Sequence, residues 1–245
     1  MAASARGRPV VAACVALALG SGLGGCVSTQ RKNARAELVA DRTLAGRAPL
    51  RLRHASRSVR VVRVALVRGA RASAFVVTLR DRGAAATDVP LAVGVRGAGG
   101  RRIAANGRGG LGWFRTHVPS IGAGAGTTWV FTARRALPAG TPYAVAGAAG
   151  GAVASHVRGA LPSLAARAVG RARGGVVVAL VNRSAIPQYD VQVYAVARDR
   201  GRVLAAGAAS IAHVGSQGRA RVRVALVGDP GRHPVRVFAP PTIFE

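Results

Sequence analysis

Few residues in this sequence have the types and spacing that a catalytic or metal site requires. The five histidines are widely separated, and none has the short spacing of a zinc site. No Gly-x-Ser-x-Gly nucleophile elbow is present, and the Gly-Ala-Gly-Ala-Gly stretch at 122–126 lacks the Gly-Lys-Ser/Thr ending of a phosphate-binding loop. Because only 8 of 245 residues are acidic, carboxylate pairs are hard to assemble. The sequence therefore predicts a non-catalytic protein without a metal or other cofactor.

The best candidate for a recognition site is the adjacent aromatic pair Trp113 and Phe114. The pair stands between Gly112 and Arg115 in a glycine-rich stretch. Exposed aromatic side chains often anchor binding interfaces. A competing interpretation is that one of the two rings packs on the core and contacts no partner.

Positive charge dominates the chain, because 36 Lys and Arg against 8 Asp and Glu give a formal net charge of +28. Arginines in the predicted strands alternate with apolar residues, which places them on outward faces. These arginines are Arg63, Arg80, Arg219, Arg221 and Arg223. A basic segment at 47–60 adds Arg51, Arg53 and Arg57 as candidate interaction residues. Such a surface favours anionic lipids or wall polymers, whereas the low aromatic content of 4% argues against a nucleic-acid partner.

The N-terminal segment has the parts of a bacterial export signal in their usual order. A short basic stretch precedes an apolar run of about ten residues, which is too short to span a membrane. The run leads into Leu23, Gly24, Gly25 and Cys26, which resemble the lipobox of bacterial lipoproteins. The resemblance implies that signal peptidase II cuts before Cys26, and that the acylated cysteine anchors the protein to the outer face of the cytoplasmic membrane. Cys14 would be removed with the signal, leaving no internal disulfide.

Period-two alternation begins near Val59 and predicts several short antiparallel strands in each half of the chain. Before it, the pattern predicts a short helix at 33–45, and alternation at 50–53 is compatible with a strand. The expected organisation is a signal peptide at 1–25, a lipidated tether with a short helix and a basic segment at 26–58, a β-sandwich at 59–146, a linker at 147–170 and a second β-sandwich at 171–245.

The two β-rich halves follow a common plan. Placing Asp190 on Asp88 aligns successive strands of the second half with those of the first. The alignment puts Val177, Ala179 and Val181 under Phe75, Val77 and Leu79. It also puts His117 and His213 in corresponding loops, where packing against the end of the sandwich is the expected role.

Residues 176–184 form a predicted strand that runs into an Asn182-Arg183-Ser184 turn, and two further strands meet at Asp199-Arg200-Gly201. This order resembles the F-x-L-Y-D class of small bacterial immunoglobulin-like domains. Ala197-Arg198-Asp199 stands where that class prefers Leu-Tyr-Asp, and the resemblance covers about a fifth of the chain. It implies a fold and an exported location, without a ligand. The expected fold class is mainly β, with two tandem antiparallel immunoglobulin-like β-sandwiches after a signal peptide, tether and short helix.

Together these features predict an exported lipoprotein that binds or organises an anionic partner in the cell envelope. The partner is the membrane through Cys26, together with an anionic lipid, a wall polymer or an envelope protein. The alternative is an accessory subunit of an envelope transport or export system, bound to a membrane protein. An enzyme with an unrecognised site is a third reading.

Overall fold

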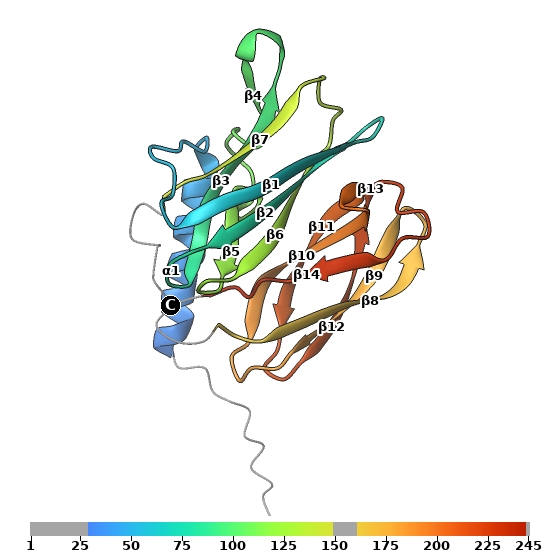
Figure 1. Ribbon diagram of the computed structural model, residues 1–245. Coiled ribbons are helices and arrows are strands. Elements are labelled where there is room, and N and C mark those ends of the chain that lie inside the picture. The colour runs from blue at the N-terminus through green and yellow to red at the C-terminus, as the bar shows by residue number, and fades with distance from the viewer. Residues whose placement is uncertain (1–28, 149–160, 244–245) are drawn as a thin grey trace, which may run out of the picture.

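The computed structural model describes residues 29–148 and 161–243, which form one long helix followed by a mainly β structure (Figure 1). The helix α1 covers Thr29–Arg47 and extends beyond the predicted helix at both ends. The apolar residues of α1 are only partly buried, because Leu38 is half-buried whereas Leu44 remains 58% exposed.

The strand predicted at 50–53 is wrong, because this segment between α1 and the first strand is irregular. Leu52 is half-buried without strand pairing, since its side chain lies against the backbone of Gly147. Pairing begins only at Ala55, which forms an isolated antiparallel bridge with Gly147. The apolar alternation therefore reflects one packed leucine in a coil.

The first half contains two antiparallel sheets and two short 3-10 helices, η1 and η2. Its elements are β1 (Val59–Arg68), β2 (Ser73–Asp81), β3 (Ala86–Arg96), η1 (Ala98–Gly100), β4 (Arg102–Ala104), η2 (Trp113–Arg115), β5 (His117–Ile121), β6 (Gly126–Ala133) and β7 (Thr141–Ala146). In one sheet β2 lies between β1 and β6. In the other, β3 is central, with β7 along one edge and β4 and β5 along the opposite edge.

The second half repeats this pairing order. Its strands are β8 (Leu164–Ala172), β9 (Gly175–Asn182), β10 (Gln188–Asp199), β11 (Arg202–Val214), β12 (Arg219–Ala225), β13 (Val227–Gly228) and β14 (Val235–Phe238). β9 lies between β8 and β12 in one sheet, and β10 lies between β14 and β11 in the other, which β13 extends. Thus β9 holds the place of β2, and β10 the place of β3.

A shared irregularity marks the equivalent strands β3 and β10. Asp88 and Asp190 both have left-handed backbones, with φ of 48° and 49°. Each residue is left out of the pairing of its strand while the register stays the same on both sides of it, so each marks a local backbone distortion without an extra residue. The alignment of these two aspartates from sequence therefore joins positions with the same backbone geometry.

The alignment of β9 on β2 is wrong by one residue. The inward side chains of β9 are Val176, Val178 and Leu180, each at most 2% exposed, while Val177, Ala179 and Val181 are half-buried on the outer face. Strand side chains alternate faces, so a slip of one residue exchanges core and surface. The slip arises in the turn between β9 and β10, which is one residue longer than the corresponding turn of the first half.

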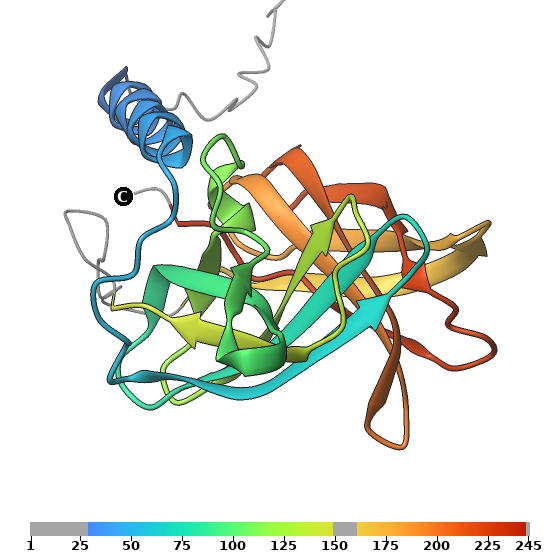
Figure 2. The same ribbon diagram turned by 90° about the horizontal axis from the view of Figure 1, so that it is seen from above.

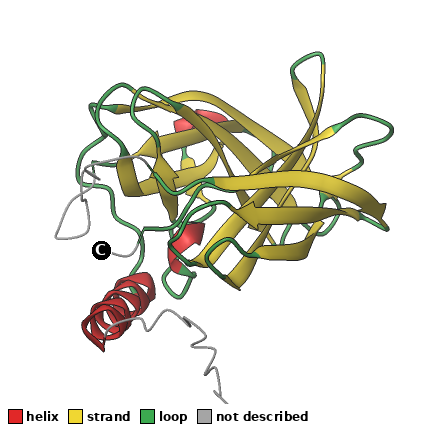
Figure 3. Cartoon of the chain, turned by 90° about the horizontal axis from the view of Figure 1, so that it is seen from below, coloured by secondary structure: helices red, strands yellow, loops and turns green. Residues whose placement is uncertain are grey.

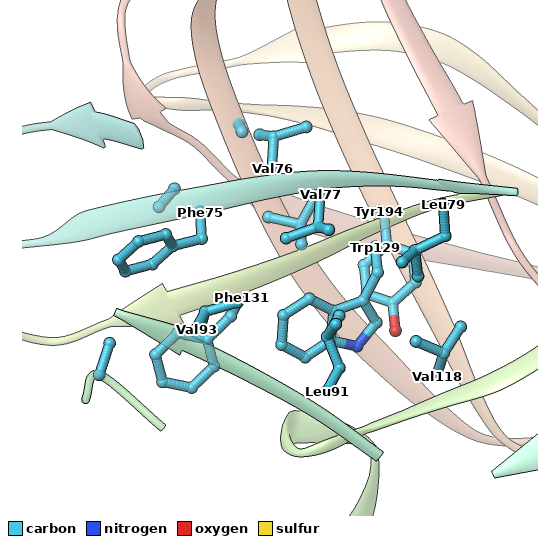
Figure 4. Packing of buried hydrophobic residues seen from close by; sticks show 14 of the residues in the cluster. Phe75, Val76, Val77, Leu79, Leu91, Val93, Val118, Trp129, Phe131 and Tyr194 are labelled. Carbon is cyan, nitrogen blue, oxygen red and sulfur yellow. The ribbon is translucent and has the colours of Figure 1, made fainter. Parts of the chain in front are cut away.

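The four sheets stack so that the halves share a core (Figures 1 and 2). Phe75, Val77, Trp129 and Phe131 point between the two sheets of the first half, and Val76 lies on the opposite side of β2 (Figure 4). That opposite side is covered by three side chains of β10 and β11, which are each at most 1% exposed: Tyr194, Val196 and Ala206. A solvent-exposed outer face was the expectation for the strands of the first half. In the middle of β2 and β6 this face is instead buried against the second half.

The first strand departs from its predicted alternation at one point. Val62 shares the apolar alternate positions of this strand with Val64 and Leu66, which predicts that it points inward, yet it is 63% exposed. The pairing of β1 with β2 shifts between Val61 and Arg63, which makes Val62 the extra residue of a bulge. Beyond the bulge, Val64 and Leu66 pack against the core as predicted.

Candidate functional site

The most elaborate polar site lies where α1 meets both halves of the chain, at one end of the stacked sheets (Figures 2 and 3). A cleft of about 480 Å³ opens there between α1, the segment around η2, and strands β10 and β11. Its lining is mixed polar and apolar and includes Arg47, Trp113, Arg115, Asp190 and Gln192. The cleft is partly open to solvent.

A buried ion pair fixes α1 beside this cleft. Arg42 on α1 donates from Nη2 to Oδ2 of Asp88 at 2.5 Å, and the two side chains are 6% and 4% exposed. The other carboxylate oxygen of Asp88 accepts a hydrogen bond from Nε1 of Trp113 at 2.8 Å. Burial raises the pKa of Asp88, while the charge and hydrogen bonds of Arg42 and Trp113 oppose the rise. The left-handed backbone of Asp88 aims its carboxylate at both partners.

A second arginine of α1 reaches the equivalent position in the other half. The guanidinium of Arg35 lies 3.3 Å from the ring centre of Tyr189, which precedes Asp190. Arg35 and Arg42 are seven residues apart, about two helical turns, so they project from the same side of α1. The helix therefore contacts the same feature of each repeat, once through an ion pair and once through an aromatic ring.

The C-terminal residues also join the halves at this place. Ser120 of β5 donates to the carbonyl of Pro241 at 2.7 Å, and Arg42 donates to the carbonyl of Ile243 at 3.3 Å. The Thr242 hydroxyl donates to the carbonyl of Tyr189 at 2.5 Å, and the backbone N–H of Thr242 donates to the side-chain carbonyl of Gln188 at 3.0 Å. The end of β14 thus continues as a strap over the junction.

The predicted aromatic pair divides between core and cleft. Phe114 is buried, with only 7% exposure, and the guanidinium of Arg42 lies 5.1 Å from its ring centre. Trp113 is half-buried, lines the cleft and stacks on His117 with ring centres 3.6 Å apart. One ring therefore packs inward, and the other remains partly available at the rim of the cleft.

His117 and His213 lie in strands β5 and β11, so their assignment to loops is wrong. They are not equivalent either, because His213 pairs with Tyr189 whereas the residue paired with the matching Thr87 is Ser120. The pKa of His117 is lowered to about 4, mainly by burial; a hydrogen bond with the backbone carbonyl of Trp113 opposes this shift, and the charge of Arg42 adds to it. His117 is therefore a neutral packing partner of Trp113 at neutral pH.

Arg115 links the cleft to a smaller hollow beneath it. Its guanidinium donates to the carbonyl of Thr132 at 2.7 Å and lies 5.1 Å from the ring centre of Phe131. Nε of Arg115 is buried and has no hydrogen-bond acceptor among the described residues. Burial, followed by the nearby charge of Arg134, lowers the pKa of Arg115. Arg115 shares the lining of the cleft with Arg42 and Arg47, so the cleft is cationic.

The basic segment after α1 does not share this site. Arg51, Arg53 and Arg57 are all exposed in the irregular stretch that follows the helix. Since α1 has 19 residues, this stretch begins about 27 Å along the helix axis from Thr29. The structure therefore brings Trp113 and Phe114 together with α1 at the cleft, and none of the three arginines lines the cleft.

The strand arginines are exposed, as their alternation predicted. They are Arg63, Arg80, Arg219, Arg221 and Arg223. None of the five forms an ion pair with a carboxylate of the described chain. Like charges crowd where the halves meet: burial, followed by Arg63 and Arg236, lowers the pKa of Arg198. Much of the positive charge thus remains uncompensated at the surface.

The lipobox residues Leu23, Gly24, Gly25 and Cys26 lie outside the described residues. In the part of the chain that is described, no three His, Cys, Asp or Glu side chains gather as a metal site would require. None of the described helices is both long and apolar enough to cross a membrane. No protein-family model matches the chain, and no curated protein is significantly similar to it.

The ion pair of Arg42 and Asp88 was not predicted from the sequence. The two residues are 46 positions apart, and a lone aspartate before a strand looks like an ordinary turn residue. The available signal was the seven-residue spacing of Arg35 and Arg42 on a predicted helix, combined with aspartates at the same place in both repeats. Two arginines on one side of a helix, together with an aspartate at the same position of each repeat, indicate that the helix docks on both repeats.

Proposed function

We propose that this chain is a non-catalytic lipoprotein of the bacterial cell envelope, anchored through Cys26 on the outer face of the cytoplasmic membrane, which binds anionic partners through its arginine-rich surface. The observation that carries the binding role is the exposure of strand arginines that no described carboxylate neutralises. An exposed cationic face attracts anions over a distance of about one Debye length, about 8 Å at physiological salt.

The position of α1 supports a close attachment to the membrane. Only Val27 and Ser28 separate Cys26 from the start of α1 at Thr29. Three residue steps span at most about 11 Å, and α1 is held to the sheets by the buried pair of Arg42 and Asp88. An acylated Cys26 would therefore hold the β-layers directly at the bilayer, without a long tether.

The same geometry limits which arginines meet lipid headgroups. Arg51, Arg53 and Arg57 begin about 27 Å from the start of α1, several Debye lengths from the anchor. They reach the headgroups only if α1 lies along the membrane. The anchor alone therefore leaves most of the basic surface pointing into the envelope, toward polymers and proteins.

We also propose that each half is an immunoglobulin-like β-sandwich. The antiparallel pairing, the repeated order with β2 and β3 as central strands, and the packing of one sheet on the other in each half favour it. The role of such a sandwich is to present a surface. The enzyme reading has no observation in its favour among the described residues.

Metabolic labelling with a palmitate analogue tests the anchor, with Cys14→Ala as the matched control for Cys26→Ala. We expect the wild type and Cys14→Ala to be labelled and membrane-bound, and Cys26→Ala to accumulate as an unlabelled precursor. Normal labelling of Cys26→Ala, or loss of labelling in Cys14→Ala alone, would contradict the proposal.

A further inference from the structure

The outer face of the sheet formed by β8, β9 and β12 is the one terminal layer that combines a row of arginines with a floor of small residues. Arg219, Arg221 and Arg223 alternate along β12, and all three are exposed. The outer face of the equivalent sheet in the first half carries Val76 and Val130, which are buried at 1% and 3% exposure against the second half. In the first half this face is apolar and buried against the second half, whereas in the second half the equivalent face carries arginines and is exposed.

The pairing register shows how these arginines are placed. Arg221 pairs with Ala179 of β9, and Ala179 pairs in turn with Arg167 of β8. Side chains paired across strands share a face, so Arg221 and Arg167 flank Ala179 at about 10 Å from each other. Val177 and Val181 lie on the same face on either side of Ala179, so a floor of short side chains runs between the two rows of arginine positions. Extended arginine side chains from both edges can therefore reach a group lying over the floor.

The spacing along β12 favours a linear partner. Successive outward residues of a strand are about 7 Å apart, so the three guanidiniums form a row about 14 Å long and cannot converge on one small anion. Arg223 also donates to the carbonyl of Arg173 at 2.5 Å, which orients it along the hairpin end. The strands β8, β9 and β12 contain no acidic residue that would repel an anion.

Two other anionic partners fit less well. The three strands contain no aromatic residue on which a base could stack, which disfavours single-stranded nucleic acid. The hairpin end of β8 and β9 lies on the side of the molecule opposite α1 in both views, and α1 begins three residues after Cys26 (Figures 1 and 2). If the anchor is at Cys26, this end of the face is held away from the lipid headgroups.

We propose that the outer face of β8, β9 and β12 binds a linear polymer whose phosphodiester charges are separated by short polyol units. The inference rests on the proposed function, because it names the anionic partner. Each guanidinium of the row meets one phosphate through paired N–H donors. The uncharged polyol units lie on the floor of Val177, Ala179 and Val181. No covalent step is involved.

The test measures binding of the full chain, extracted in mild detergent, to a fluorescent poly(glycerol phosphate). The variant Arg219→Gln/Arg221→Gln/Arg223→Gln is compared with Arg96→Gln/Arg101→Gln/Arg108→Gln, which removes the same charge from exposed positions of the first half. We expect the β12 variant to bind at least about tenfold more weakly, and to lower the slope of log affinity against log salt by about 2, because three phosphate contacts are lost. The control should bind within about threefold of the wild type.

The remaining outcomes separate the assignment from the proposed function. Equal losses in the two variants would overturn the assignment and leave a general charge effect. Equal or tighter wild-type binding to polygalacturonate, to phosphatidylglycerol vesicles or to oligo(dT) would overturn the choice of polymer. If the β12 variant self-associates in size-exclusion chromatography with its binding unchanged, the arginines protect an edge strand and the assignment fails. If the wild type binds none of these probes, the proposed anion-binding function fails as well.

Discussion

The buried pair of Arg42 and Asp88 predicts a large and non-additive loss of stability when one partner is removed. Arg42→Met leaves the Asp88 carboxylate buried with only the Trp113 N–H identified as a donor to it. Asp88→Asn keeps an acceptor for Trp113 and tolerates the left-handed backbone, since Asn is common there. It leaves the Arg42 guanidinium without its carboxylate. Each change leaves one charge without its partner in a buried site, where the two side chains are at most 6% exposed.

The expected magnitude follows from that burial. Removing one partner of a buried ion pair costs about 3–5 kcal/mol, because an uncompensated charge remains in a low-dielectric site. The helix α1 can limit the loss by undocking, so we expect about 3 kcal/mol for each single variant. The double variant Arg42→Met/Asp88→Asn removes both charges, and its loss should be smaller than the sum of the single losses by about 2 kcal/mol.

Urea unfolding followed by tryptophan fluorescence measures these losses, because Trp113 is hydrogen-bonded to Asp88. The control is Asp199→Asn, which removes the carboxylate of the exposed contact with His233 at 3.9 Å. Exposed pairs contribute about 0–1 kcal/mol, so the control should stay near the wild type. Single losses below about 1 kcal/mol that add in the double variant would refute the view that this pair docks α1.

Three further predictions concern the rest of the fold. Burial holds the pKa of His117 at about 4, below its unfolded value of 6.5, so between those values only the unfolded state gains a proton. The free energy of unfolding should therefore fall by about 3 kcal/mol as the pH drops through this window. In His117→Gln, urea titrations at each pH should no longer show that part of the pH dependence. Gly207→Ala should cost about 2 kcal/mol, since the new Cβ would stand 1.9 Å from the carbonyl oxygen of Ala225, whereas Gly215→Ala, which meets nothing within 4 Å, should change the free energy of unfolding by less than about 0.5 kcal/mol. A chain cut by a specific protease at a recognition site inserted between residues 148 and 161 should give two fragments that elute together, because Val76 and Tyr194 belong to one shared core; fragments that separate without denaturant would contradict this.

Much of the β structure could be predicted from period-two alternation, and the reasons for the errors are physical. Val89, Leu91 and Val93 alternate cleanly and face the core, because β3 has one buried face along most of its length. Val62 breaks the pattern at a bulge, which no alternation reveals in advance. The one-residue slip on β9 arises in the longer turn before β10, and the pattern did not reveal it because valines occupy both faces of β9.

The shared core had a signal in the sequence that the alternation obscured. Phe75-Val76-Val77 and Trp129-Val130-Phe131 are unbroken apolar runs, which are typical of strands buried on both faces. They fit a sheet covered by β10 and β11 better than a half-solvated one. The docking of α1 had a weaker signal, since the pairing of Arg42 with Asp88 depends on tertiary contacts between distant residues.

The most direct test of the proposed binding role is the composition of material that copurifies with the protein after mild crosslinking of intact cells. The wild-type protein is predicted to carry organic phosphate and polyol in stoichiometric excess over its own lipid anchor. The Arg219→Gln/Arg221→Gln/Arg223→Gln variant should lose this material and remain membrane-bound. Recovery of one discrete protein with both forms, without bound polymer, would contradict the account and favour an accessory subunit of a transport or export system.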